Sequence, residues 1–287
     1  MRRIFNLSVI ISFIIATASV QAQSDSSLYP SLNQQKTETR TENTSTEYSL
    51  VWSDEFTESQ IDTSVWNFWE GTAYNNELQY YTDRPENIFI DDGKLHIRAQ
   101  KEDYGGMNYT SARISTDSTS IGWKYGRFEA KIKMPDGKGY WPAFWLMPIR
   151  EIGWPRGGEI DIMEFRGNEP YTTTGAIHFY REGCEGSSVE CRKYITDSIT
   201  QADTNLTEEF HVYALEWTEE ELVWYLDNTE FMRIKLNDVK AEYNPFSTPF
   251  YIILNLAVGG DFLDNPDEST PFPQSLVVDY VRVYQKD

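Results

Sequence analysis

The sequence predicts an all-β protein, a sandwich of two antiparallel sheets. About a dozen short segments alternate apolar and polar residues or are apolar on both sides, and turns rich in Gly, Pro and Asp separate them. No segment has the apolar spacing of a long amphipathic helix. Many short strands without helices to cover them indicate two sheets that pack on each other.

The predicted strands are either apolar on one face only or apolar on both faces. Residues 94–99 place Leu95 and Ile97 on one face, and residues 127–134 alternate in the same way before the turn at residues 135–137. Residues 221–226 and 229–234, joined by Asp227 and Asn228, predict a hairpin. Residues 251–256 read as a strand buried on both faces, and residues 276–284 form the last strand.

The first 47 residues differ from the rest of the chain. Arg2 and Arg3 precede an apolar run over residues 4–18, and small residues lead to Ala22, which predicts a signal peptide over residues 1–22. The run is too short for a membrane span. Residues 23–47 are polar and predict a flexible leader, so the folded domain is expected over residues 48–287 and the protein in the periplasm or outside the cell.

The formal net charge is −20, which disfavours binding to nucleic acids and other polyanions. The two cysteines, Cys184 and Cys191, lie close together in the sequence, and export to an oxidising compartment favours a disulfide between them. Closing such a small loop adds roughly 2–3 kcal/mol to the free energy of unfolding in the chain-entropy model. Zinc binding is the alternative, but further ligands are not found nearby.

The most informative segment carries three acids, Glu159, Asp161 and Glu164. On a regular strand Glu159 and Asp161 share a face and Glu164 falls on the other. One extra residue, a β-bulge around residues 162–163, would return Glu164 to the face of the other two. Glu159 and Glu164 could then bring their carboxyl groups to about 5–5.5 Å, the separation that a retaining glycosidase needs.

Mutual repulsion among three neighbouring acids raises the pKa of at least one of them, so one carboxyl can serve as a general acid while another stays ionised. Two other interpretations remain open from the residues alone. The acids could be solvated on an exposed edge strand, or they could bind calcium.

The segment from Glu159 to Glu164 resembles the E-x-D-x-x-E signature of glycoside hydrolase family 16, and its flanks resemble the bacterial laminarinases of that family. The resemblance covers nearly everything after residue 47. It rests on residues 52–56, 74–81, 111–114, 140–148, 153–159, 176–178, 255–260 and 278–284.

The resemblance implies a concanavalin-like jelly roll with a concave substrate cleft and hydrolysis with retention. Glu159 would be the nucleophile, Glu164 the general acid/base, and Asp161 would assist. The inserted Met163 is typical of the laminarinase, agarase and carrageenase side of the family, and residues 74–81 and 153–155 favour laminarinase. The expected substrate is a β-1,3-glucan, with mixed β-1,3/1,4-glucan as an extension. The alternatives are agarose, carrageenan or lichenan as substrate, and a glucan-binding protein without activity.

The resemblance also implies roles for other residues. The expected sugar-binding residues are Asn75, Glu77 and Arg113 on the donor side, His178 near the cleaved bond, and Trp141, Trp145 and Trp154 as stacking platforms. No organic cofactor is expected, and we expect a monomer. A structural Ca²⁺ could be held by the carboxylate of Asp279 and the backbone oxygens of Glu55 and Gly93.

Overall fold

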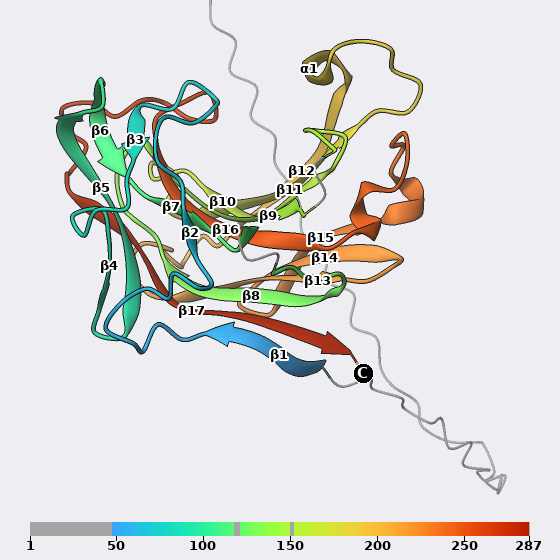
Figure 1. Ribbon diagram of the computed structural model, residues 1–287, viewed down its shortest axis with the longest axis horizontal. Helices are drawn as coiled ribbons and strands as arrows, with labels where there is room; N and C mark the ends of the chain where they lie inside the picture. Colours follow the sequence, from blue (N-terminus) through green and yellow to red (C-terminus); the bar gives the residue numbers. More distant parts are fainter. Residues whose placement is uncertain (1–47, 118–120, 150–151, 287) are drawn as a thin grey trace, which may run out of the picture. The chain divides into compact units, whose positions relative to one another are not determined.

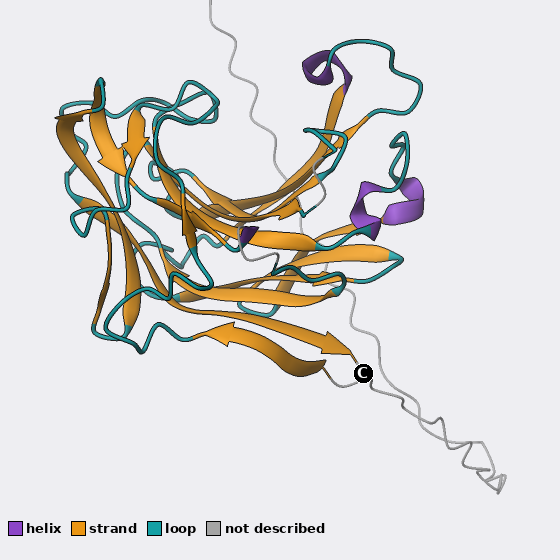
Figure 2. Cartoon of the chain, in the orientation of Figure 1, coloured by secondary structure: helices purple, strands orange, loops and turns teal. Residues whose placement is uncertain are grey.

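The computed structural model describes residues 48–117, 121–149 and 152–286. The predicted signal peptide and leader lie outside the described residues. Within these ranges nearly all of the regular secondary structure is β-strand, and two largely antiparallel sheets pack on each other (Figures 1 and 2). This confirms the predicted fold class. No helix in this part of the chain is long and apolar enough to cross a membrane.

The larger sheet has ten strands in the described residues. Its strands are β1 (Tyr48–Asp54), β3 (Gln79–Tyr81), β4 (Ile88–Asp91), β5 (Lys94–Tyr104), β6 (Met107–Ser111), β8 (Gly126–Lys133), β13 (His211–Trp217), β14 (Glu221–Leu226), β15 (Thr229–Lys235) and β17 (Gln274–Lys286). The main path runs β15-β14-β13-β8-β17-β5-β6-β3, with β1 on β17 and β4 on β5.

The smaller sheet has seven strands in the order β12-β11-β10-β9-β16-β7-β2, counted over the described residues. Its strands are β2 (Asn67–Phe68), β7 (Arg113–Ser115), β9 (Tyr140–Pro148), β10 (Glu159–Phe165), β11 (Thr172–Tyr180), β12 (Arg192–Thr200) and β16 (Phe250–Val258). This sheet is curved, and its concave face points away from the larger sheet (Figure 1). The helical segments named in the described ranges are the short α-helix α1 (Ser188–Cys191) and the 3₁₀ turns η2 (Leu236–Asp238) and η3 (Pro245–Ser247).

The core lies between the sheets and is built from the side chains that alternate inward. Leu95 and Ile97 on β5 are fully buried, as the period of that strand predicts. Strand β16 is buried along nearly its whole length, which agrees with its apolar sequence. The predicted hairpin is β14–β15, and its turn residues Asp227 and Asn228 have the positive φ values, 48° and 67°, that a tight hairpin turn requires.

The two cysteines form the predicted disulfide, with 5.7 Å between their Cα atoms. The bond closes the connection between β11 and β12 around α1. A capping box at Ser187 and Glu190 fixes the start of this one-turn helix.

Candidate active site

The three acids of β10 lie on one face of the sheet because the strand contains a bulge. Asp161 is opposite Ala176 of β11 and Glu164 is opposite Thr174. Ala176 and Thr174 are two residues apart and share a face, whereas β10 uses three residues for the same distance. Glu159, two residues before Asp161, also lies on this face. The bulge predicted at residues 162–163 is therefore confirmed.

The apolar residues of β10 explain which face the acids occupy. These side chains are all buried in the core between the sheets, and they are Ile160, Ile162, Met163 and Phe165. The acids therefore point to the concave side, away from the core. Glu164 has not turned to the reverse of the sheet, so it shares the face of Glu159, as the catalytic assignment requires.

Two tryptophans donate hydrogen bonds to the outer acids. Trp154 Nε1 donates to Glu159 Oε2 at 2.6 Å, and Trp141 Nε1 donates to Glu164 Oε1 at 3.1 Å. A bond from an N–H group to a carboxylate stabilises the ionised form, more strongly when it is short. The shorter bond therefore favours ionisation of Glu159 over that of Glu164.

His178 stands beside the first two acids. Its Nε2 lies 3.3 Å from Asp161 Oδ2 and 3.9 Å from Glu159 Oε1. The Asp161 side chain is only 5% exposed, against 16% for Glu159. The imidazole thus lies at the edge of Glu159, and its contact with sugar near the cleaved bond remains a prediction.

Burial raises the pKa of all three carboxyls above their ordinary values. Next to burial, repulsion from Asp161 raises the pKa of Glu159, while His178 lowers it. Glu164 experiences repulsion from both Asp161 and Glu159, and its pKa rises to about 8. The pKa of Glu159 also rises to about 8, so burial and repulsion keep a proton on the pair near neutral pH. The shorter hydrogen bond from Trp154 to Glu159 favours Glu164 as the carboxyl that carries this proton.

A hydrogen-bonded network links the segment after residue 74 to the concave face. Tyr81 OH donates to Glu77 Oε2 at 3.1 Å and accepts a bond from Asn255 Nδ2 at 3.2 Å. Asn255 Oδ1 in turn accepts a 2.7 Å bond from Trp145 Nε1. Burial raises the pKa of Glu77, and bonds from Gln79 and Tyr81 oppose that rise.

Arg113 belongs to the same region. Its guanidinium carbon lies 4.8 Å from the centre of the Trp145 ring and 5.0 Å from that of Trp69, so it sits between two indoles. Arg113 and a bond from Asn75 both lower the pKa of Glu77. The structure therefore brings the predicted donor-side residues Asn75, Glu77 and Arg113 together beside Trp145.

The predicted tryptophans differ in their surroundings. Trp154 is 36% exposed, while Trp141 stacks on Phe262 with ring centres 4.8 Å apart. Trp145 is half-buried beneath Arg113. All three lie at the acids or at the network beside them, and their contact with sugar remains a prediction.

Several residues of the site were not predicted from the sequence, and four of them have a clear structural role or an exposed ring. Trp224 of the other sheet donates from Nε1 to the backbone oxygen of Asp161 at 2.8 Å. Asn255 connects Trp145 to Tyr81, and Trp69 and Tyr194 expose large parts of their rings near the site. Asn255 could have been found from the sequence, because it is the polar residue of an otherwise apolar strand. The roles of the other three follow from strand register and tertiary packing, which the sequence pattern does not show.

Metal binding was considered at two places. Glu159, Asp161 and His178 form the one group of three His, Cys, Asp or Glu side chains, among the described residues, that are close enough to share an ion. The predicted calcium site uses a different set. There, Asp279 Oδ2 accepts a 2.7 Å bond from Lys131, and the Glu55 carboxylate pairs with Arg282. A cation at the Asp279 carboxylate would have to displace Lys131, and the calcium site stays a prediction.

The site can be compared with known proteins. The family model for glycosyl hydrolases family 16 matches residues 75–281. A β-glucanase of Rhodothermus marinus is 40% identical over 257 residues, which is 83% of this chain and 85% of the relative.

Two solved structures are also similar. The endo-β-1,3-glucanase from Pyrococcus furiosus has a TM-score of 0.75 and 41% identity, over 84% of this chain and 95% of that one. The laminarinase catalytic domain from Thermotoga maritima has a TM-score of 0.74 and 39% identity, over 84% and 99%. The chain belongs to glycosyl hydrolases family 16.

Proposed function

We propose that the chain is a retaining endo-hydrolase of laminarin-type β-1,3-glucan that also accepts mixed-linkage β-1,3/1,4-glucan. The observation that carries this proposal is the bulge, which sets Glu159, Asp161 and Glu164 side by side on the concave face. The relatives named β-glucanase, endo-β-1,3-glucanase and laminarinase support the choice of substrate.

In the first step Glu159 attacks the anomeric carbon of the sugar on the donor side, and the glycosidic C–O bond breaks. Glu164 gives its proton to the departing oxygen, which leaves as a free hydroxyl group. A covalent glycosyl-enzyme on Glu159 remains. Burial and repulsion keep one carboxyl of the pair protonated, and the shorter hydrogen bond from Trp154 to Glu159 favours Glu164 as that carboxyl, which is the protonation that this step requires.

In the second step Glu164, now ionised, takes a proton from a water molecule. The water oxygen attacks the same anomeric carbon and releases Glu159 as a carboxylate, so the configuration is retained. Asp161 shares a hydrogen bond with Glu159, and His178 Nε2 lies 3.9 Å from Glu159 Oε1, so both side chains help to hold the nucleophile in place. The acids complete both steps without an organic cofactor.

The test combines two substitutions with a substrate panel. Glu159→Ser and Glu164→Ser should each abolish the release of reducing ends from laminarin while the far-UV circular dichroism spectrum stays that of the wild type. Glu219→Ser, at an exposed acid in the turn between β13 and β14 of the larger sheet, is the control and should keep full activity. Near-normal turnover by either glutamate variant would contradict the mechanism.

Laminarin, lichenan and agarose distinguish the substrates. We expect release of reducing ends in that order, with none from agarose. Nuclear magnetic resonance of the first product formed should show the β-anomer, as retention requires. Binding of laminarin by the wild type without release of reducing ends would favour a glucan-binding protein instead.

We propose further that the chain is exported, because residues 1–22 have the pattern of a signal peptide. N-terminal sequencing of the protein made by its own host should begin at residue 23. Calcium can be tested by the melting temperature with added CaCl₂ and with a chelator. Equal values would exclude a structural Ca²⁺ at Asp279.

A further inference from the structure

Strand β12 forms the free edge of the concave sheet on the side opposite to Arg113. The edge strand pairs with β11 over its whole length, from Thr172 opposite Thr200 to Tyr180 opposite Arg192. Directly opposite residues of antiparallel strands share a face. Since His178 lies on the concave face and is opposite Tyr194, Tyr194 lies there too.

Tyr194 extends the row of catalytic residues outward. Glu159 is opposite His178, and His178 is opposite Tyr194. Two strand spacings, roughly 10 Å, therefore separate the backbones of Glu159 and Tyr194. Tyr194 is 56% exposed, so one face of a large ring remains open to a ligand at this distance from the nucleophile.

The ring of Tyr194 belongs to an aromatic cluster at the site. His178 lies between Tyr194 and Trp154, with ring centres 5.7 Å and 6.2 Å away. The guanidinium carbon of Arg192 is 5.6 Å from the centre of each of these two larger rings. Two exposed aromatic faces with a cation between them suit a neutral sugar, which stacks its ring and donates and accepts hydrogen bonds at its hydroxyl groups.

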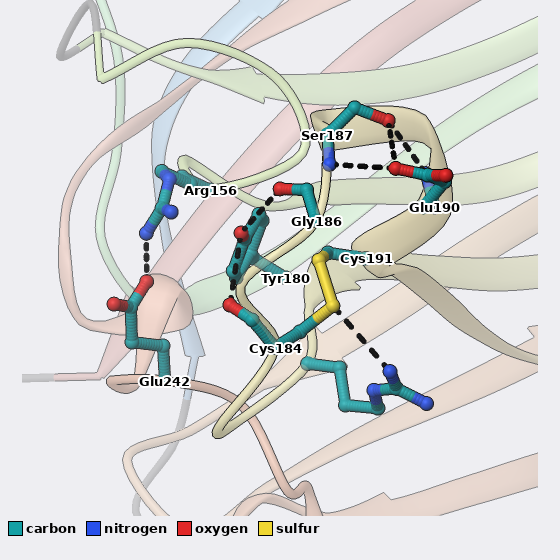
Figure 3. The surroundings of a disulfide bond; sticks show 9 residues. Arg156, Tyr180, Cys184, Gly186, Ser187, Glu190, Cys191 and Glu242 are labelled. Atoms are coloured by element: carbon teal, nitrogen blue, oxygen red, sulfur yellow. Dashed lines mark hydrogen bonds and ion pairs between the residues drawn. A yellow bond between two sulfur atoms is a disulfide. The ribbon is translucent and has the colours of Figure 1, made fainter.

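The disulfide anchors this cluster. Cys191 is fully buried and directly precedes Arg192, and its bond to Cys184 ties the start of β12 to the end of β11 (Figure 3). Tyr180 OH, at the end of β11, donates to the backbone oxygens of Cys184 and Gly186 at 3.1 and 3.2 Å.

The loop that carries Trp154 is docked on the same element. The Arg156 guanidinium carbon lies 3.6 Å from the centre of the Tyr180 ring, and Arg156 forms an ion pair with Glu242 (Figure 3). Arg192 and Tyr194 thus lie on the strand that begins directly after the closed loop, and the loop of Trp154 contacts Tyr180, whose hydroxyl is bonded to that closed loop.

We propose that Tyr194, with Arg192, forms a sugar-binding subsite on the acceptor side of the cleaved bond, and that the Cys184–Cys191 disulfide positions it. The acceptor side follows from its location, because the donor-side residues lie across β9, β16 and β7 on the far side of the acids. The ligand is the leaving portion of a β-glucan chain, so the inference rests on the proposed function.

The experiment compares two substrates. Laminarin fills both sides of the site, whereas a nitrophenyl laminaritrioside fills the donor side and has an aryl leaving group. Loss of a stacking contact with sugar in Tyr194→Ala should lower kcat/KM on laminarin about three- to tenfold and leave kcat/KM on the aryl substrate unchanged. Tyr194→Phe keeps the ring and should stay near the wild type.

Ile195→Ala is the matched control, because Ile195 is the next residue of β12 and points to the other face. It should leave the ratio of the two kcat/KM values unchanged. Equal losses on both substrates in Tyr194→Ala, or the same ratio in Tyr194→Ala and Ile195→Ala, would overturn the subsite. An inactive wild type would contradict the proposed function instead.

The positioning role of the disulfide is tested with the double variant Cys184→Ser/Cys191→Ser. Here KM for laminarin should rise severalfold, kcat should hold, and the aryl substrate should be cleaved as before. Unchanged KM in a variant proven by mass spectrometry to lack the bond would show that the disulfide does not position Tyr194.

Discussion

Trp224 provides the sharpest test of how the fold supports the bulge. This side chain is fully buried on β14 of the opposite sheet, and its Nε1 donates to the backbone oxygen of Asp161 at 2.8 Å, where the register of β10 shifts. A bulge interrupts the regular ladder, so its backbone groups need other partners. We predict that Trp224→Phe destabilises the protein and disturbs the spacing of Asp161 and Glu164.

The magnitude follows from the structure by comparison with Trp217. Trp217 is also fully buried, on the neighbouring strand β13, but its Nε1 has no hydrogen-bond partner among the described residues. Trp217→Phe therefore removes volume alone, whereas Trp224→Phe removes similar volume and leaves a buried carbonyl oxygen unpaired. The difference between the two variants should be about 1–3 kcal/mol in the free energy of unfolding.

Urea denaturation, followed by circular dichroism, measures this difference, and kcat on laminarin measures the effect on the acids. Trp224→Phe should lower both quantities more than Trp217→Phe, with KM unchanged, because the spacing of the acids affects the chemical step. Equal unfolding free energies within about 0.5 kcal/mol, or equal kcat values, would refute the role of the indole bond.

Three further predictions concern the acids and their support. Glu164→Gln should lower kcat by about a hundredfold or more. The pKa of Glu164 rises to about 8 in the folded protein, so ionisation of this carboxyl lowers the stability of the wild type as pH rises from 5 to 9. Gln cannot ionise, and the variant should therefore be more stable than the wild type at pH 9 by about 2–4 kcal/mol in urea denaturation. Gly175→Ala should lower the melting temperature, because its Cβ would lie 2.6 Å from Trp224 Cδ1. An unchanged melting temperature would show that the Trp224 side chain can shift to make room for the methyl group. Asn255→Ala should raise KM for laminarin more than it lowers kcat, because it releases Trp145 from its 2.7 Å bond; a loss confined to kcat would contradict a role in binding.

Much of the fold follows from local patterns. The period of residues 94–99, the turn at Asp227 and Asn228 and the apolar run of β16 each depend on neighbours in the sequence, and all three were predicted. The bulge was also predictable, because only an extra residue can place Glu159 and Glu164 on one face of a strand.

The rest of the site depends on information that a local pattern does not contain. The bond from Trp224 joins the two sheets, and the place of Tyr194 beside His178 depends on the register of β12 against β11. Register is set by the packing of the whole sheet and by the closed loop between Cys184 and Cys191, not by the residues of β12 themselves. Asp279 illustrates the same limit, since its pairing with Lys131 is a tertiary contact.

The rows of opposite residues on the concave sheet have an evolutionary consequence. Glu164, Ala143, Asn255 and Arg113 form one such row across four strands, and their immediate sequence neighbours point to the other side, into the core. A change at one position of a row therefore alters the surface that a bound polysaccharide contacts, while the core side chains behind the sheet stay the same. Selection can adjust the preferred polysaccharide one position at a time without endangering the stability of the scaffold.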